Sequence, residues 1–244
     1  MKRTLIFGLL ALGLVSCATP PAAVSEQPEK LKPLRLVIIG DSTVCNYPPT
    51  EANHREGWGM HIQEYFTDDL TVSNLAASGR STKTFIQEGR WARALAERPD
   101  VVLIQFGHND SHAPANPEAT NAATDFRDYL RQYIDDARAI GAVPILVTPM
   151  CRRTATDTLA PYAEAMKIIA AEKNVALIDL HASSARLYAQ LGPAETKTLE
   201  GGDTTHFNAR GAEAMARLVM AELPSADPAL KPYLQSPLRQ NSAP

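Results

Sequence analysis

Residues 34–43 read LRLVIIGDST, and the rest of the fold can be worked out from this stretch. Its aliphatic and β-branched run ends in Gly40, Asp41 and Ser42, as expected for a buried parallel strand that delivers a polar residue to its end. In open α/β sheets, ligands bind at the edge where the strands end. Ser42 is therefore the first candidate nucleophile. On its own the pattern is more often a plain turn or helix cap, because Asp and Ser are common in both.

Strand-like and helical segments alternate along the chain. The strand-like segments are short and rich in Val, Ile and Leu, at residues 36–39, 70–73, 101–106, 143–148 and 176–179. Helical patterns occupy residues 58–66, 90–97, 119–140, 161–173, 182–190 and 208–223. This alternation predicts a parallel sheet with helices on both faces. One stripe of the long helix should pack on the sheet, and it comprises Phe126, Leu130, Tyr133, Ile134 and Ala137.

The length of 244 residues fits one α/β domain, which we expect at residues 33–223. The formal charge is −3 and no Lys/Arg-rich run is present, so a nucleic-acid partner is not expected. We expect a monomer. Residues 224–244 carry five prolines and little periodicity. They predict an irregular tail, either held on the surface or loose.

Residues 1–16 have the pattern of a secretory signal peptide. Lys2 and Arg3 precede an apolar run that is too short to span a bilayer, and their removal would leave a net charge of −5. The segment LVSC, ending at Cys17, resembles the bacterial lipobox, in which cleavage leaves the cysteine as a lipid-modified N-terminus. The alternative is an ordinary signal peptide with Cys17 merely near the cleavage site.

The residue after Cys17 sets the expected location of this anchor. Ala18 at this position resembles lipoproteins sent to the outer membrane. We therefore expect a bacterial cell-envelope protein that meets the membrane only through its N-terminal lipid and faces the periplasm or the cell surface. Residues 17–32 are rich in Pro, Ala, Ser and Glu/Gln, which predicts a disordered tether.

A serine nucleophile requires a base and a group that orients that base. His206 lies in the segment GGDTTHFN, after the last strand and before the final helix, and Asp203 precedes it by three residues. One loop could therefore present both the carboxylate and the imidazole. The alternative makes Asp203 a turn residue and His206 a surface histidine before the Asn208 helix cap.

Acyl transfer also needs donors aimed at the oxyanion of the tetrahedral intermediate. Gly79 lies in AASGRS after the second strand, and without a side chain its N–H can approach a substrate closely. Asn109 lies in FGHND after the third strand and supplies a side-chain amide. Taken alone, each segment is ordinary turn chemistry.

Together, these segments resemble the four signature blocks of the SGNH (GDSL-type) hydrolases. The blocks are Gly-Asp-Ser, Ser-Gly, Gly-x-Asn-Asp and Asp-x-x-His, in the right order and at the right strand ends. The Gly-x-Ser-x-Gly elbow of the α/β-hydrolases is absent. Longer stretches resemble the rhamnogalacturonan acetylesterase branch: GDSTV at 40–44, GWG at 57–59, NLAASGRST at 74–82, EGRW at 88–91, GHND at 107–110 and TPMCRR at 148–153.

The resemblance implies a flavodoxin-like three-layer α/β/α domain, with a five-stranded parallel sheet in the order 2-1-3-4-5 and no metal or organic cofactor. It implies that Ser42 is the nucleophile, His206 the base and Asp203 the group orienting His206. The oxyanion hole would comprise the Ser42 and Gly79 N–H groups and the Asn109 side chain. The substrate would be an acetylated polysaccharide or oligosaccharide.

Several other side chains near the strand ends are candidates for substrate contact. Trp58, Trp91 and Arg80 could contact sugar rings, although Trp58 fits a core aromatic equally well. Arg152 and Arg153 could attract the carboxylates of galacturonate, or form a solvated basic pair.

Histidine and cysteine residues in the same loops raise other possibilities. His108 is a further candidate for substrate contact; with His112 it has a zinc-like spacing, but no third ligand is evident and metal is not expected. Cys45 and Cys151 stand where the resemblance leads us to expect small residues such as Ala and Ser. They could form a disulfide or remain reduced and partly buried.

The leading hypothesis is an extracytoplasmic serine esterase that deacetylates plant cell-wall polysaccharide, with pectic rhamnogalacturonan ahead of xylan or another carbohydrate. A lysophospholipase-like lipid esterase is the enzymatic alternative, disfavoured by polar residues after the nucleophile, among them Asn46, His54 and Arg55. A non-catalytic carbohydrate-binding lipoprotein should lack a triad or oxyanion residue, and none is missing.

Overall fold

The computed structural model describes residues 30–50, 54–154 and 156–235. The predicted signal peptide, Cys17 and most of the predicted tether lie outside the described residues, as do residues 236–244. Among the helices of the described ranges, none is both long and apolar enough to cross a membrane.

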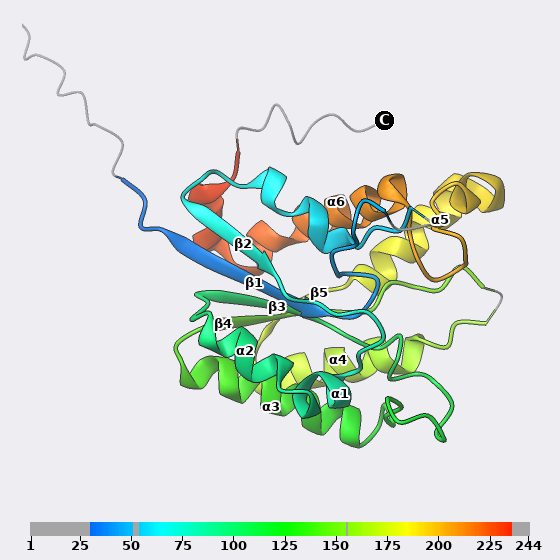
Figure 1. Ribbon diagram of the computed structural model, residues 1–244, viewed down its shortest axis with the longest axis horizontal. Coiled ribbons are helices and arrows are strands. Elements are labelled where there is room, and N and C mark those ends of the chain that lie inside the picture. Colours follow the sequence, from blue (N-terminus) through cyan, green and yellow to red (C-terminus); the bar gives the residue numbers. More distant parts are fainter. Residues whose placement is uncertain (1–29, 51–53, 155, 236–244) are drawn as a thin grey trace, which may run out of the picture. The chain divides into compact units, whose positions relative to one another are not determined.

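Five parallel strands form one sheet in the order β2-β1-β3-β4-β5 (Figure 1). Their bounds are Leu34–Gly40 for β1, Leu70–Asn74 for β2, Val101–Gln105 for β3, Val143–Val147 for β4 and Ala176–Ile178 for β5. Each strand matches a predicted segment to within one or two residues, because short apolar runs buried on both faces are characteristic of parallel strands. The predicted fold class and strand order are confirmed.

Helices cover both faces of the sheet, giving three layers (Figure 1). One face carries α1 (Thr82–Gln87), α2 (Arg90–Ala96), α3 (Asp125–Ala139) and α4 (Ala160–Lys173), and the other carries α5 (Leu180–Lys197) and α6 (Ala209–Ala226). Alternate residues of β1 serve the two sides: Leu36 and Ile38 belong to the core under α6, and Val37 and Ile39 to the core under α3 and α4. This alternation follows from the two-residue period of a strand.

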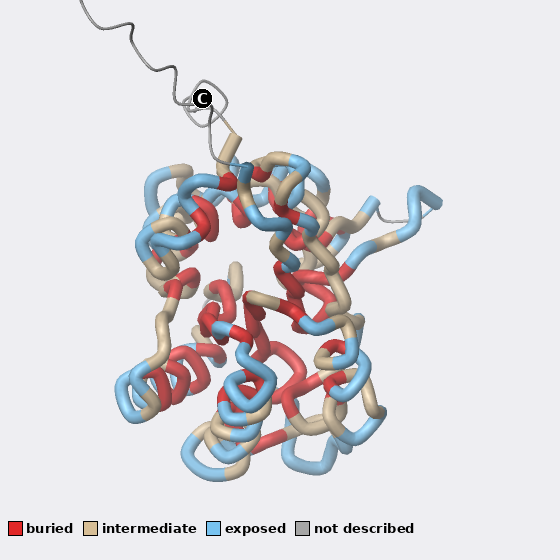
Figure 2. The backbone as a smooth tube through the Cα atoms, turned by 90° about the vertical axis from the view of Figure 1, so that its left-hand side faces the viewer, coloured by how far each residue is buried: buried red, intermediate tan, exposed pale blue. Residues whose placement is uncertain are grey.

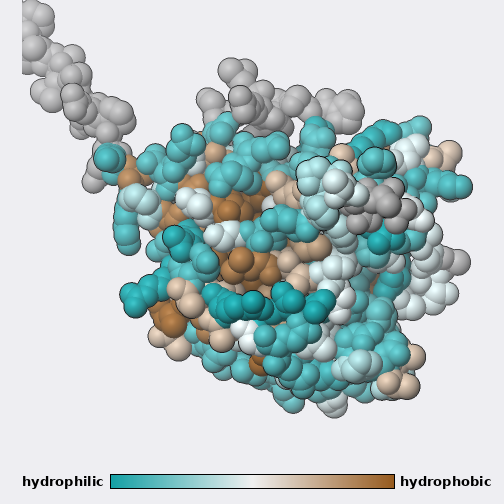
Figure 3. All heavy atoms as spheres, in the orientation of Figure 1, coloured by the Kyte–Doolittle hydropathy of each residue, from teal (hydrophilic) through white to brown (hydrophobic). Residues whose placement is uncertain are grey.

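Buried residues concentrate between the layers, while exposed residues follow the outer turns of the helices (Figure 2). The predicted stripe of α3 is fully buried, from Phe126 to Ala137. Figure 3 shows the face seen in Figure 1, where most side chains are hydrophilic. Apolar side chains gather on this face between the two helix layers, near the edge strand β2.

Some helices differ from their predicted bounds. Residues 58–66 form two 3-10 helices, η1 (Trp58–His61) and η2 (Gln63–Tyr65), instead of an α-helix. α3 starts at Asp125 and not at residue 119, because the Asn121 side chain accepts from the Ala123 N–H and forms a turn there. α1 was not predicted; a capping box between Ser81 and Thr84 starts it.

The C-terminal tail is not irregular over its described part, so the predicted domain boundary at 223 is too early. α6 continues to Ala226, and the 3-10 helix η3 (Pro228–Tyr233) follows. Leu230 and Tyr233 are buried in the core, and Tyr233 donates a hydrogen bond to the Lys32 carbonyl at 2.8 Å. The prolines end regular helix without preventing these apolar side chains from packing.

Candidate active site

Ser42 lies in a tight turn immediately after β1. Asp41 shapes the turn, because its Oδ1 accepts hydrogen bonds from the Thr43 N–H at 2.9 Å and the Thr43 hydroxyl at 2.7 Å. The Asp41 carbonyl accepts from the N–H groups of Val44 and Cys45. The turn presents one small hydroxyl, on a residue only 6% exposed, at the edge where ligands bind to open sheets.

The imidazole of His206 links Ser42 to Asp203. His206 Nε2 lies 2.9 Å from Ser42 Oγ, and His206 Nδ1 lies 2.8 Å from Asp203 Oδ2. Both distances are within the reach expected between a nucleophile, its base and the group orienting that base. The fold therefore brings together three predicted residues from the two ends of the domain.

The two carboxylate oxygens of Asp203 have separate tasks. Oδ1 accepts from the backbone N–H groups of Thr205 and His206, each at 2.8 Å, and so folds the loop around the carboxylate. Oδ2 holds the imidazole. Burial alone would raise the pKa of Asp203, but hydrogen bonds from the His206 backbone and ring and from Thr205 lower it to about 2. Asp203 is therefore an anion at neutral pH.

Arg55 reaches the same carboxylate from the segment that follows the nucleophile. Its Nη2 donates to Asp203 Oδ2 at 3.0 Å and its Nε to the Gly201 carbonyl at 3.1 Å. An antiparallel bridge between Glu56 and Phe207 places Arg55 there. In the sequence Arg55 is one polar residue among several after the serine, and no spacing links it to Asp203.

Arg153 also contacts the loop that carries Asp203 and His206, which we call the catalytic loop of the candidate site. Its side chain is only 3% exposed, its Nη2 donates to the His206 carbonyl at 2.7 Å, and its guanidinium lies 4.3 Å from the centre of the Phe207 ring. Arg152 donates from Nη1 to the Thr205 hydroxyl at 2.7 Å and from Nη2 to the His108 carbonyl at 3.1 Å. Arg152 and Arg153 therefore do not form a solvated basic pair, because both guanidinium groups donate hydrogen bonds to other residues of the chain.

The predicted oxyanion donors also lie at this edge. Gly79 has a left-handed backbone with φ +78° and open space where a side chain would be, which suits close approach of a ligand. Asn109 Nδ2 donates to the Arg80 carbonyl at 3.0 Å, and an amide nitrogen carries a second hydrogen. Among the described residues, neither the Ser42 nor the Gly79 N–H donates to a backbone carbonyl.

Comparison with known proteins shows the family of the chain. The family of GDSL-like lipases and acylhydrolases matches residues 38–214. The chain belongs to this family of SGNH hydrolases. Rhamnogalacturonan acetylesterase RhgT of Bacillus subtilis (strain 168) is 37% identical over 228 residues, covering 84% of this chain and 96% of that protein. Acetylxylan esterase of Xylanibacter ruminicola is 26% identical, covering 78% of this chain and 43% of that protein.

Solved structures agree on the fold. Protein YXIM of Bacillus subtilis superposes with a TM-score of 0.69 at 30% identity, covering 80% of this chain and 57% of that one. A catalytic mutant of Axe2, an acetylxylan esterase from Geobacillus stearothermophilus, superposes with a TM-score of 0.63 at 23% identity, covering 80% and 96%. The resemblance to the SGNH hydrolases and their rhamnogalacturonan acetylesterase branch is confirmed.

In this SGNH hydrolase, three side chains predicted as candidate substrate contacts are buried. Trp58 is fully buried and donates from Nε1 to Gln105 Oε1 at 2.8 Å. Trp91 is buried and donates to Asp136 at 3.0 Å. His108 is buried, with Nδ1 3.4 Å from Asp41 Oδ2. Trp58 therefore fits the core-aromatic alternative, whereas His108, next to Asn109, stays a candidate contact, because Ser42 itself is only 6% exposed.

The predictions for Arg80 and for the two cysteines have different outcomes. Arg80 is partly exposed beside Gly79 and pairs with Glu88 at 3.0 Å, so it stays a candidate contact of this SGNH hydrolase. Cys45 and Cys151 are free thiols and form no disulfide with each other. Burial raises the pKa of the Cys45 thiol to about 11.

Proposed function

We propose that this SGNH hydrolase is a serine esterase that removes O-acetyl groups from plant cell-wall polysaccharide, with pectic rhamnogalacturonan as the substrate. The observation that carries the proposal is the hydrogen-bonded chain of Ser42, His206 and Asp203. Further support comes from the relatives in Bacillus subtilis named rhamnogalacturonan acetylesterases.

The proposed reaction has two steps. Ser42 Oγ attacks the acetyl carbonyl while His206 Nε2 takes the hydroxyl proton, and Asp203 stabilises the imidazolium that forms. The Ser42 and Gly79 N–H groups and the Asn109 amide bind the oxyanion. The intermediate collapses, and His206 returns the proton to the leaving sugar hydroxyl. Water, activated by His206, then hydrolyses the acetyl-enzyme to acetate and restores Ser42.

Two other enzymatic substrates compete with pectin. Acetylated xylan presents the same ester, and a relative named acetylxylan esterase favours it. A lipid ester would require an apolar trough beside the nucleophile. The charged groups of Arg55, Asp203 and Arg152 near Ser42 disfavour such a trough.

Acetate release by the purified full chain tests the proposal. Acetate release is measured on acetylated rhamnogalacturonan and acetylated xylan, and fatty-acid release on a lysophospholipid, for the parent, Ser42→Ala and the exposed-site control Ser225→Ala. We expect the parent to release acetate from rhamnogalacturonan. Ser42→Ala should lose about a thousandfold or more of this rate, and the control should keep the rate of the parent. Equal rates in the parent and Ser42→Ala would refute the serine mechanism. Binding of polysaccharide without any hydrolysis would leave a carbohydrate-binding lipoprotein instead.

We also propose that Cys17 carries a lipid anchor, on the support of its lipobox-like segment and the apolar run before it. In a bacterial host, the parent should fractionate with membranes and Cys17→Ser should not. A mass spectrum showing an unmodified N-terminal cysteine would rule out lipidation.

A further inference from the structure

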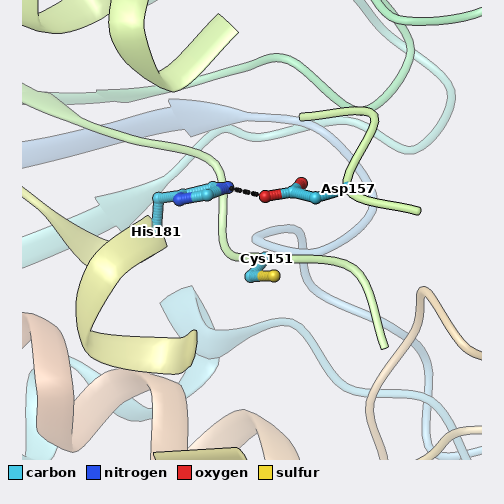
Figure 4. A group of neighbouring side chains, drawn as sticks. All are labelled: Cys151, Asp157 and His181. Carbon is cyan, nitrogen blue, oxygen red and sulfur yellow. Dashed lines mark ion pairs between the residues drawn. The ribbon is translucent and has the colours of Figure 1, made fainter. Parts of the chain in front are cut away.

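Cys151, Asp157 and His181 form a cluster outside the Ser42–His206–Asp203 chain (Figure 4). Cys151 follows β4, Asp157 precedes α4, and His181 lies in the first turn of α5. One thiol sulfur, one carboxylate oxygen and one ring nitrogen lie within 4.8 Å of one another. Thiolate, imidazole and carboxylate are the ligands that zinc takes in proteins.

The backbones of two members are tied together by a buried hydroxyl. Ser184 Oγ accepts from the Cys151 N–H at 3.0 Å and donates to the His181 carbonyl at 3.1 Å. The His181 N–H in turn donates to the Thr148 hydroxyl at 2.8 Å. Ser184 and Thr148 are both fully buried. The backbone positions from which the sulfur and the imidazole project are therefore fixed by neighbouring groups.

Asp157 divides its carboxylate between the loop and the cluster. Oδ1 accepts from the Leu159 N–H at 3.1 Å, while Oδ2 lies 2.9 Å from His181 Nε2. That contact lacks hydrogen-bond alignment, and the buried Nε2 has no hydrogen-bond partner among the described residues. A cation between the nitrogen and the carboxylate would satisfy both.

From these contacts we propose that Cys151, Asp157 and His181 bind a zinc ion, with water in the fourth position. Tetrahedral zinc places sulfur about 3.6 Å from nitrogen, and nitrogen about 3.4 Å from oxygen. Movements on the order of 1 Å convert the present cluster into that geometry. Thiolate and carboxylate together neutralise Zn²⁺, and the proton of the thiol leaves to solvent on binding.

Of the three residues, Cys151 also lines a surface pocket of about 690 Å³, whose lining includes Arg152, Arg153 and Lys197. Sulfur and imidazole ligands select zinc over Mg²⁺ and Ca²⁺, which prefer oxygen. The site is structural: it ties the segment carrying Arg152, which reaches Thr205 of the catalytic loop, to the start of α5.

Zinc titration of the full chain, starting from metal-free protein, tests the site. The variants are Cys151→Ser, His181→Asn and Asp157→Asn, and the last keeps the acceptor for the Leu159 N–H. The matched controls, Cys17→Ser and Cys45→Ser, change the other two cysteines of the chain. We expect one zinc per chain, and a loss of affinity of at least about a hundredfold in each of the three variants but not in the controls.

Two further readouts separate metal ligation from folding. Co²⁺ in place of zinc should give a sulfur-to-metal charge-transfer band that Cys151→Ser abolishes and Cys45→Ser retains. Without metal, the parent and Asp157→Asn should melt at the same temperature. Zinc at a hundred times the Kd of the parent should raise the Tm of the parent by about 5 to 10 °C and leave the Tm of Asp157→Asn unchanged. No zinc binding by the parent, or equal binding by Cys151→Ser, would overturn the proposal whatever the esterase assays show.

Discussion

Two arginines, Arg55 and Arg153, hold the loop that carries Asp203 and His206. Arg55 binds the carboxylate of Asp203, and Arg153 binds the carbonyl of His206 beneath the ring of Phe207. Neither contact involves the Ser42 hydroxyl. In the proposed mechanism, both arginines are therefore positioning residues, which act on the reaction through the groups they hold.

Replacing Arg55 by Ala should lower kcat about 10- to 100-fold with little change in KM, because Arg55 holds Asp203 and does not touch substrate. Arg55→Lys should recover part of the rate. Arg210→Ala is the matched control, since Arg210 is exposed and pairs with Glu195. Steady-state kinetics of acetate release measure both constants. A raised KM with unchanged kcat would instead make Arg55 a substrate contact.

The thiol of Cys45 should resist alkylation in the folded protein. Burial raises its pKa to about 11, so at pH 8 the reactive thiolate is scarce. We expect iodoacetamide to modify Cys45 at least about a hundredfold more slowly in the native chain than in the denatured chain. Peptide mass spectrometry follows the modification site by site. Similar rates in the two states would show that the turn opens readily.

At the scale of elements, a buried relay fixes the end of β1. Trp58, in η1, donates to Gln105 at the end of β3, and Gln105 donates from Nε2 to the Thr43 hydroxyl at 3.1 Å. Thr43 follows the nucleophile directly. Three separate segments are therefore joined through one amide side chain beneath the catalytic edge.

Gln105→Leu should lower the free energy of unfolding by about 1–3 kcal/mol. The substitution removes the hydrogen bonds of Gln105 with the Trp58 N–H and the Thr43 hydroxyl, while both groups stay buried. Gln87→Leu, at an exposed position of α1, is the control and should change little. Denaturant unfolding monitored by tryptophan fluorescence measures both. An equal effect in the two variants would show that the relay adds no stability.

At the scale of the whole molecule, acid stability depends on carboxylates held as anions. The pKa of Asp203 lies at about 2, below its ordinary value of 3.8. As the pH falls, the Asp203 carboxylate is therefore protonated at a higher pH in the unfolded chain than in the folded chain. The stabilisation from Asp203 is complete above the ordinary value and is lost as the pH falls through about 2.

The parent should consequently lose more stability between about pH 5 and pH 2 than Asp203→Asn does. Denaturant midpoints across this range measure the difference, and Asp68→Asn, which removes an exposed carboxylate, should follow the parent. If Asp203→Asn shows the same pH slope as the parent, the carboxylate is not held as an anion by its loop.

Much of the fold and of the candidate site could be predicted from the sequence, because the signals are local. Apolar runs buried on both faces mark each parallel strand, and polar residues mark the strand ends. Three of the four signature blocks lie at such ends, so the sheet topology carries Ser42 to the same edge as Gly79 and Asn109, while Asp203 and His206 lie in the loop between α5 and α6. The short distance between Asp203 and His206 allowed one loop to present both.

What the sequence by itself determined is the order of the strands, the family and the identity of the proposed catalytic residues. Only the tertiary structure decided that Trp58 and His108 are buried, that Arg153 lies under the catalytic loop, and that Cys151, Asp157 and His181 come together. The physical reason is range: burial and clustering depend on contacts between segments far apart in the chain, which leave no periodic pattern within either segment.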